Sequence, residues 1–479
     1  MKKWLSENNK ILLIIVGFII ILSSFTNLDQ DLYWHLKNGE DIINNGISNT
    51  DHFSYWGGNF ISHEWLYDIL LFSLFKIDGL RLIKIVSFIA IGISMFLSFK
   101  VFAKKSNNGN IFINIVPIIL WATGRILLEA RPQIASLLSF CLVIYLLEMN
   151  KHIWSIPIIT LLTANLHGGM SLLVLIVPVI YLISYIFDSE KVSKEYIIKL
   201  IGIICISFLT LGITPYGFKN VTYGFTMPNW VYDRIAEWQV IIKGISDSWI
   251  LIIMILPLFS MIISKKATVK DILFFCMGLI LTFIHLRMVL IFVPIYIMFG
   301  SQYLLDLINI FRNKELKEKK DVKFNKIFNA NIILIVLCLI VSYNISTINF
   351  QRIEKTSESS PVIIKEYIEN NEIDVENNIM FNEYGYGGYF IFNNIPVFID
   401  GRADVYLEEY GNKPIMKDYQ LIWDRDEQTD ELIEKYNIQY WAIPKNGDLY
   451  KYLTQNSKAK VLTEDSNFAF LRTGGGEND

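Results

Sequence analysis

The sequence has few cysteines and few charged residues for its length. Its 479 residues include four cysteines, and 19% are Asp, Glu, Lys or Arg, whereas 53% are hydrophobic. Every cysteine lies inside an apolar segment, so we expect neither a disulfide nor a thiolate metal site; the four are Cys141, Cys205, Cys276 and Cys338. No glycine-rich phosphate loop follows a predicted strand, which argues against a nucleotide-binding fold. No small-residue cleavage site ends the first apolar run, so we expect an uncleaved helix there rather than a signal peptide.

Apolar runs, in contrast, are abundant. Many of them have about the length needed to cross a hydrocarbon core ~30 Å thick. We predict about eleven membrane spans, at roughly residues 11–25, 82–102, 111–126, 132–149, 153–166, 168–187, 197–214, 248–264, 271–286, 288–308 and 329–346. The expected fold class is therefore a polytopic α-helical membrane protein.

Lysines divide the connections between these spans into two sets. The lysine-rich set includes Lys104 and Lys105, Lys151, and Lys270, and by the positive-inside rule it faces the cytoplasm. The N-terminus is then cytoplasmic, and an odd number of spans places the C-terminus outside. This sorting requires residues 63–75 to form an amphipathic helix on the outer surface rather than a span. The first outer loop then covers residues 26–80.

That loop is expected to contain a second surface helix, and the chain after residue 347 is expected to form a separate domain. Leu32 to Ile43 is predicted to be helical and to end at Asn44-Asn45-Gly46. Residues 348–473 are predicted to be an extracytoplasmic α/β domain, followed by a flexible tail at 474–479. Its expected helices are 361–370, 413–421 and 427–436, and its expected strands are 378–381, 396–400, 440–443, 460–462 and 468–471, with a turn running into a further strand at 385–392.

Asp29 and Asp31 open the first outer loop, directly after the first apolar run. One carboxylate could act as general base on an acceptor hydroxyl while the other orients it or helps to hold a divalent cation such as Mg or Mn. The structural alternative is an N-cap for the helix that begins near Leu32. Their position just after a span, followed by Trp34 and His35, favours the functional interpretation.

Further polar residues gather at the predicted outer ends of the spans, which indicates a shared outer cavity. Arg125, Arg131 and Arg287 could hold a phosphate leaving group through bidentate contacts, or could simply extend towards the lipid headgroups. The expected substrate-binding residues also include His35, His63, Glu64 and His167. His63 and His167 could each bind substrate or metal, and a hydrogen-bonded structural role is the alternative for these two histidines. No pair of potential ligands has zinc-type spacing.

Another charged cluster lies at a predicted strand end of the C-terminal domain. Asp400, Arg402 and Asp404 occupy alternate positions in the sequence. A salt-bridged turn is the favoured interpretation, and a contact that closes the domain over the membrane site is the alternative.

Several of these segments resemble a known class. The Asp-bearing first loop, the segment Ser62-His-Glu-Trp-Leu-Tyr67, the many spans and the outer α/β domain resemble the GT-C glycosyltransferases. The N-terminal part resembles the dolichyl-phosphate-mannose protein mannosyltransferases, in which a His/Lys-Pro-Pro-Leu-Tyr segment closes the loop; the prolines are missing here. Other segments resemble uncharacterised bacterial and archaeal GT-C-like membrane proteins: 131–133, 165–169, 387–389 and 397–404.

The resemblance implies transfer of a sugar, hexosyl or pentosyl, from a polyprenyl-phosphate donor to a protein, glycan or lipid acceptor outside the cytoplasm. Asp29 or Asp31 matches the catalytic carboxylate position of that class, and direct displacement predicts inversion at the anomeric carbon. We expect no nucleic-acid partner. Two other functions stay open: a non-catalytic scaffold of a cell-envelope assembly, and a lipid or glycan transporter, which would bury its charges nearer the bilayer midplane.

Overall fold

The computed structural model describes residues 30–106, 111–114, 116–118, 130–187, 193–234, 248–315 and 360–474. Its contacts divide the chain into two compact units. The first, which we call the helical unit, comprises residues 1–27, 83–224 and 228–348. The second, which we call the mixed unit, comprises residues 28–82, 225–227 and 349–479. The contacts thus group the first outer loop with the C-terminal region, whereas the sequence analysis assigned that loop to the membrane domain.

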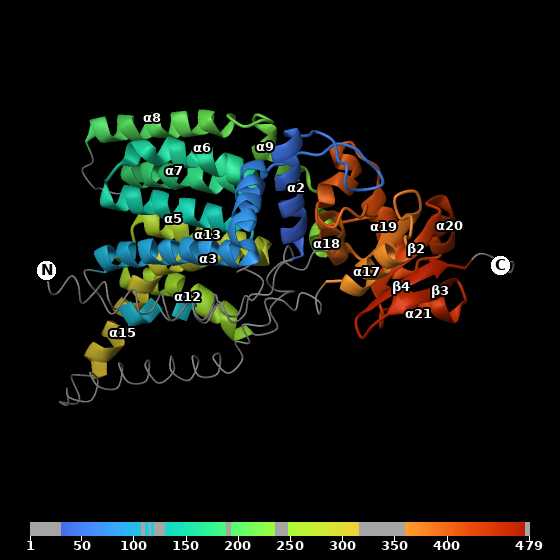
Figure 1. Ribbon diagram of the computed structural model, residues 1–479. Helices are drawn as coiled ribbons and strands as arrows, with labels where there is room; N and C mark the ends of the chain where they lie inside the picture. The colour runs from blue at the N-terminus through green and yellow to red at the C-terminus, as the bar shows by residue number, and fades with distance from the viewer. Residues whose placement is uncertain are drawn as a thin grey trace. The chain divides into compact units, whose positions relative to one another are not determined.

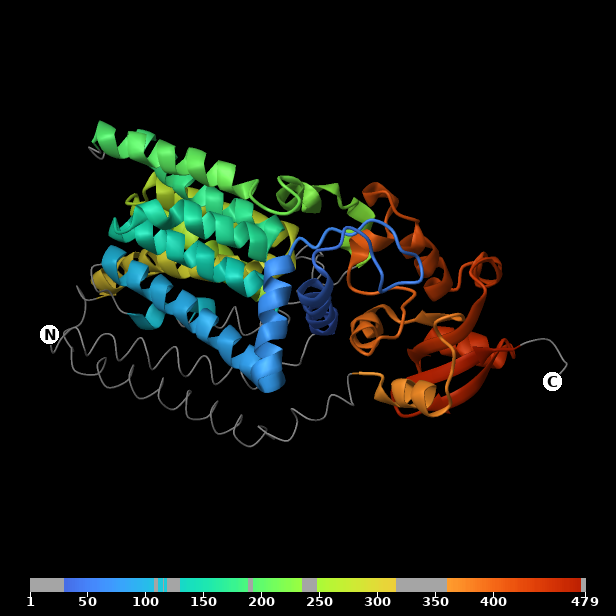
Figure 2. The ribbon, with the colours of Figure 1, turned by 45° about the horizontal axis from the view of Figure 1, so that its top comes forward.

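Apolar helices lie side by side in the helical unit (Figures 1 and 2). They are the second half of α3 (Trp65–Lys105), α5 (Gln133–Met149), α6 (Ile156–Leu166), α7 (Ser171–Phe187), α8 (Lys194–Leu211), α12 (Ser248–Ser264), α13 (Val269–Ile284), α14 (Val289–Ile295) and α15 (Ser301–Glu315), with a π-helical turn at Tyr296–Gly300 before α15. Two short helices, α9 (Lys219–Thr222) and α10 (Asn229–Arg234), follow α8. The core of the helical unit is apolar and includes Phe99, Phe140, Tyr181, Phe274 and Phe292.

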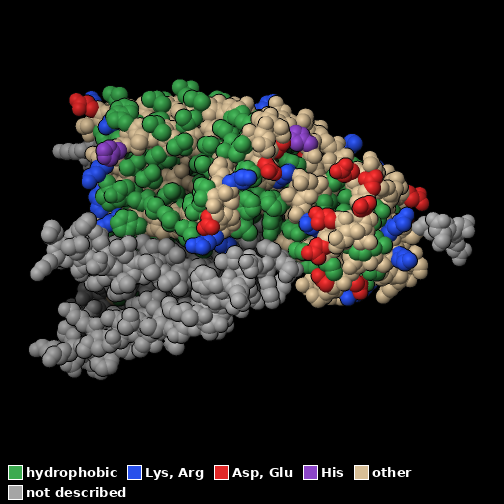
Figure 3. All heavy atoms as spheres, in the orientation of Figure 1, with side chains coloured by type: hydrophobic (Ala, Val, Ile, Leu, Met, Phe, Trp, Pro, Cys, Tyr) green, Lys and Arg blue, Asp and Glu red, His purple; other side chains and the backbone are tan. Residues whose placement is uncertain are grey.

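Three helices among the described residues are long and apolar enough to cross a membrane. They are Trp65–Lys105, Gly168–Phe187 and Leu286–Ile308. Shorter apolar helices cover 133–149, 153–166 and 251–264, and large apolar side chains cover much of the surface of this unit (Figure 3). The predicted spans 11–25 and 329–346 lie outside the described residues, so the predicted count of about eleven stays a prediction.

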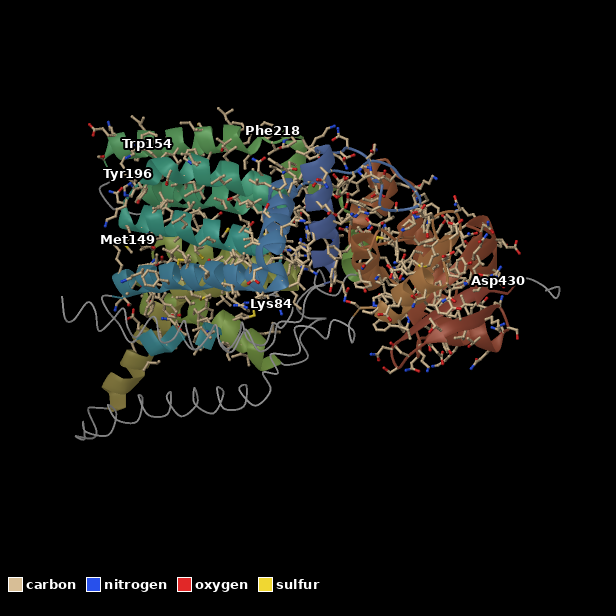
Figure 4. All side chains as sticks on the ribbon, in the orientation of Figure 1. Lys84, Met149, Trp154, Tyr196, Phe218 and Asp430 are labelled. Atoms are coloured by element: carbon tan, nitrogen blue, oxygen red, sulfur yellow. The ribbon has the colours of Figure 1, made fainter. Side chains whose placement is uncertain are left out.

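Lysines from separate connections meet at one end of the helical unit. The Lys105 ammonium contacts Asp271, Lys270 Nζ lies 2.6 Å from Glu148 Oε1, and Lys199 lies over the Trp154 ring. Figure 4 shows Met149, Trp154 and Tyr196 at this end and Phe218 at the other. The lysine-bearing connections that the sequence assigned to one side of the membrane are therefore brought together in space.

The mixed unit contains a four-stranded sheet with the order β1-β2-β4-β3. The strands are β1 (Ile379–Asn382), β2 (Ile438–Pro444), β3 (Ala459–Glu464) and β4 (Phe468–Thr473). β1 and β2 are parallel, and the other two pairings are antiparallel. The helices are α2 (Asp31–Asn45), the first half of α3, α17 (Val362–Asn370), α18 (Gly387–Phe392), α19 (Ile415–Asp424), α20 (Thr429–Lys435) and α21 (Asp448–Gln455) (Figure 1).

Most of the elements predicted in this unit are confirmed. The surface helix at 32–43 is α2, and it ends at Gly46, whose positive φ of 85° is readily adopted by glycine. The predicted break between the surface helix and the second span is also present, because Asp78 and Gly79 leave helical geometry inside α3. The helices at 361–370, 413–421 and 427–436 and four of the expected strands are found close to their predicted positions.

Two strand predictions are wrong. Residues 387–392 form the helix α18, because an apolar run buried on all sides has no periodicity that separates a strand from a helix. Residues 396–400 are extended but pair only through a single bridge between Val397 and Ser54. Their backbone is hydrogen-bonded instead by the Asn382 side chain, which accepts from Phe398 N and donates to Ile399 O. The helix α21 was not predicted from the sequence.

Candidate functional site

The predicted acidic segment begins the helix α2. Asp31 is its first residue, while Asp29 lies outside the described residues. Gln30 occupies the N-cap position without a side-chain capping bond, so Asp31 sits one residue inside the helix, where a negative charge is favoured by the helix dipole. Asp31 is therefore not the N-cap of α2, and its half-exposed carboxylate remains a candidate for chemistry.

One face of α2 carries a buried polar network. His35 Nδ1 lies 2.6 Å from Asp68 Oδ1, and Asn38 Nδ2 donates to both Asp68 Oδ2 and Ser62 Oγ. Asp68 belongs to the first half of α3 and is fully buried, and His35 is 3% exposed. The two helices approach closely at Gly39, where any side chain would collide with the Asp68 carbonyl. The network therefore fixes the orientation of the His35 ring.

The other two predicted residues of this loop adjoin the network. His35 Nε2 lies 3.7 Å from one oxygen of Glu64, and His63 Nε2 lies 3.7 Å from the other. Both distances exceed a hydrogen bond, so these contacts are electrostatic. The structure thus brings together Asp31, His35, His63 and Glu64, as the sequence analysis expected.

Charge in this cluster changes the protonation of His35. Burial alone would lower the pKa of the imidazole, but the carboxylates of Asp68, Glu64 and Asp31 outweigh it, so the pKa is raised. The carboxylates around His35 therefore favour the protonated form of its imidazole.

The C-terminal part of the mixed unit packs directly against the start of α2. A side chain at position 388 would collide with the Gln30 carbonyl, and one at position 401 would collide with the Asp31 carboxylate. The Tyr33 ring meets Tyr389 edge-on, with 5.5 Å between ring centroids. Glycine at both positions is therefore what permits this backbone-to-helix contact.

A buried ion-pair cluster joins the first outer loop to the same part of the chain. The Arg402 guanidinium binds Asp400 through Nε and Nη2, at 2.8 and 2.7 Å, and Asp51 through Nη1 at 2.7 Å. The Tyr406 hydroxyl donates to Asp400, and the Phe53 and Phe60 rings both lie 5.1 Å from the guanidinium. This geometry agrees with the salt-bridged turn that the sequence favoured, and shows that the turn also anchors the loop.

The remaining predicted site residues belong to the helical unit. His167 follows α6, and its Nδ1 lies 2.9 Å from the Ser136 hydroxyl in the first turns of α5. Arg131 immediately precedes α5, and both it and Arg287, which lies in a 3-10 turn before α14, are half-exposed. Arg125 lies outside the described residues. The structure therefore places His167 near the α5 end that carries Arg131.

The described residues contain no group of three His, Cys, Asp or Glu side chains arranged to hold a metal ion. Asp29 lies outside the described residues, so the divalent cation stays a prediction.

Sequence reasoning missed Asp68, Asn38 and Ser62. Helical spacing offered a signal, because Asp31, His35 and Asn38 are separated by four and then three residues and so share one face of a helix. The partner of that face could not be found this way, since Asp68 is 33 residues from His35.

The fold of the chain is also found in a solved structure. No protein-family model and no curated protein sequence matches the chain. Among solved structures, the chain is similar to ArnT from Cupriavidus metallidurans bound to undecaprenyl phosphate, with a TM-score of 0.52 and 11% sequence identity over 98% of both chains. The chain therefore has the fold of ArnT, and the resemblance to GT-C membrane glycosyltransferases that the sequence indicated is confirmed at the level of the fold.

Proposed function

We propose that this chain is an integral membrane glycosyltransferase that transfers a hexosyl or pentosyl group from a polyprenyl-phosphate donor to an acceptor outside the cytoplasm. The observation that carries the proposal is the similarity to ArnT, whose structure contains undecaprenyl phosphate, over nearly the whole of both chains. The site residues add support, because the Asp31 carboxylate, a buried histidine with a raised pKa and further acids stand together at the start of α2.

The proposed reaction needs no nucleotide. One carboxylate of Asp29 and Asp31 takes the proton of the acceptor hydroxyl, whose oxygen then bonds to the anomeric carbon of the donor sugar. The bond from that carbon to the phosphate oxygen breaks, and the polyprenyl phosphate leaves with the electron pair. Arg131, Arg287 and Arg125 are the proposed cations for the leaving phosphate, because guanidinium matches its geometry. This displacement inverts the anomeric configuration.

The first experiment measures sugar transfer and donor hydrolysis by the full chain in detergent, with a panel of polyprenyl-phosphate sugars. General base catalysis contributes about 100-fold to 10,000-fold, so Asp29→Asn or Asp31→Asn should lower turnover by that amount. Asp41→Asn is the matched control, since Asp41 lies on the same helix as Asp31 and, within the described part of the chain, bonds the exposed side chains of Asn45 and His52. A product with retained configuration would contradict the displacement mechanism.

The same assay separates this function from its rivals. If the wild type binds polyprenyl phosphate but consumes no donor, with any acceptor offered, a scaffold built on this fold becomes the better account. If transfer survives both Asp variants, the acidic segment is not the source of the base.

A further inference from the structure

The indole N–H of Trp34 stands out among the polar groups of the mixed unit. Trp34 is 7% exposed, and its Nε1 has no hydrogen-bond partner among the residues that the structure describes. Buried donors are almost always bonded, and leaving one unpaired is unfavourable. Two other indoles of the same unit follow that rule, since Trp56 donates to Phe398 O at 2.8 Å and Trp441 donates to the Thr473 hydroxyl at 2.9 Å.

The direction of this N–H is fixed by the surrounding packing. The Trp34 ring stacks on His35 with 3.6 Å between centroids, and His35 is itself held by Asp68. Gly388 also lies against this ring, because a Cβ there would be in ordinary van der Waals contact with Trp34 Cδ1 at 3.6 Å. The indole therefore has little freedom to turn towards another acceptor.

Trp34 Nε1 and the Asp31 carboxylate converge on Gly401. A Cβ at position 401 would stand 3.3 Å from Nε1 and would collide with Asp31 Oδ1. Gly401 is held firmly in this place, since Tyr384 donates to its carbonyl at 3.2 Å and its neighbour Arg402 is locked onto Asp400. Asp31 and Gly401 are half-exposed, so the edge of this contact is open.

The chemistry of this pair selects its ligand. A donor beside a carboxylate complements a hydroxyl group, which accepts from the N–H and donates to the carboxylate. A phosphate oxygen would be repelled by Asp31, and an apolar group would leave the indole unpaired. A carboxylate has several lone-pair sites, so other bonds of Asp31 do not prevent this one.

We propose that the Trp34 indole N–H and the Asp31 carboxylate bind one hydroxyl of the sugar substrate, and that glycine at position 401 leaves free the space beside them that a side chain would fill. The identity of the ligand rests on the proposed function. Trp34 is then a substrate-contacting residue, and the C-terminal part of the mixed unit contributes to the site through Gly401.

The test compares three variants of the full chain in detergent, by affinity for two probes and by thermal unfolding. The probes are undecaprenyl phosphate and that undecaprenyl-phosphate sugar of the panel which the wild type binds most tightly. Trp34→Phe keeps an aromatic ring and removes the N–H, and Gly401→Ala places a methyl group beside it. Trp56→Phe is the matched control, because it removes an indole N–H that is already bonded.

Trp34→Phe should weaken binding of the sugar-linked lipid about threefold to tenfold, the effect of one neutral hydrogen bond, and leave the bare lipid phosphate unaffected. Its melting temperature should be unchanged or higher, since no bond is lost, whereas that of Trp56→Phe should fall with no change in ligand affinity. Gly401→Ala should weaken the sugar-linked lipid at least as much as Trp34→Phe. If Trp34→Phe instead leaves donor affinity intact and raises the KM of the acceptor, the bound hydroxyl belongs to the acceptor.

Other outcomes overturn the proposal. A Trp34→Phe protein with unchanged donor affinity and acceptor KM, or with equal losses for both lipids, shows that the N–H contacts no sugar hydroxyl. A wild type that binds neither lipid overturns the proposed function, and this assignment with it. The melting temperatures still show in that case whether the Trp34 N–H is unpaired in the folded chain.

Discussion

Replacing Arg402 by methionine should strongly destabilise the mixed unit. The guanidinium side chain is 1% exposed, and it neutralises two carboxylates, Asp400 and Asp51, that are fully buried. Methionine has a similar length but no charge, so both carboxylates would remain buried without their cation. Removing one partner of a buried ion pair typically costs about 3–5 kcal/mol.

The loss should be visible as a lower melting temperature. For a unit of this size, each kcal/mol lowers the melting temperature by roughly 2–4 °C, so we expect a fall of about 6–20 °C. Thermal unfolding of the full chain, followed by tryptophan fluorescence in detergent, measures it. The matched control is Lys458→Met, because Lys458 and its partner Asp430 are 30% and 57% exposed, and an exposed pair contributes at most about 1 kcal/mol (Figure 4).

The effect should also depend on pH with a defined sign. Burial alone would raise the pKa of Asp51, but Arg402 and the hydrogen bonds from Ser54 and Phe53 hold it below its usual range. A lowered folded pKa contributes stability that is complete above the unfolded value of about 3.9 and is lost as the pH falls below it. Arg402→Met should therefore be most damaging near neutral pH. A melting temperature within 2 °C of the Lys458→Met protein at pH 7 would refute the view that this cluster anchors the loop.

Two further predictions concern α2 and its contact with α3. Because the pKa of His35 is raised, its contribution to stability is complete below about pH 6.5 and is lost as the pH rises through the folded value. The melting temperature should therefore fall as the pH rises above about 6.5, and Asp68→Asn should reduce that slope. A slope unchanged in Asp68→Asn would exclude this pair as its source. Gly39→Ala should destabilise by about 1–3 kcal/mol, because its methyl group would collide with the Asp68 carbonyl, measured as a shift of the urea midpoint. Gly202→Ala, in α8 with open space around it, should instead leave stability unchanged or raise it, and equal shifts for the two variants would contradict the close approach.

Local patterns in the sequence predicted the elements whose signals are local. The end of α2 follows from the run Asn44-Asn45-Gly46. The strands β2 and β4 are predicted by apolar, aromatic-rich runs between turn residues. Such features need only a few neighbouring residues, which the sequence displays directly.

The site was predicted only in part, because its contacts are not local. Asp31, His35, His63 and Glu64 could be named from their type and position, yet nothing in the sequence indicates that Asp68 binds His35. The helix α18 was mistaken for a strand because its apolar run has no distinguishing periodicity, and the contact that its Gly388 makes with Gln30 lies more than 350 residues away in the sequence. A residue whose role is a contact far away in the sequence gives no local signal of the secondary structure around it.

The same reasoning gives the C-terminal region a role in the proposed chemistry. Arg402 reaches back to Asp51, Gly388 and Gly401 reach back to Gln30 and Asp31, and Trp34 faces the turn that Arg402 holds. A region that only bound partners elsewhere would not need a buried ion pair with Asp51, nor two glycines that pack directly against the start of α2. The C-terminal region is therefore better understood as lining one side of the proposed site. Its buried turn around Arg402 positions that side next to the acidic segment.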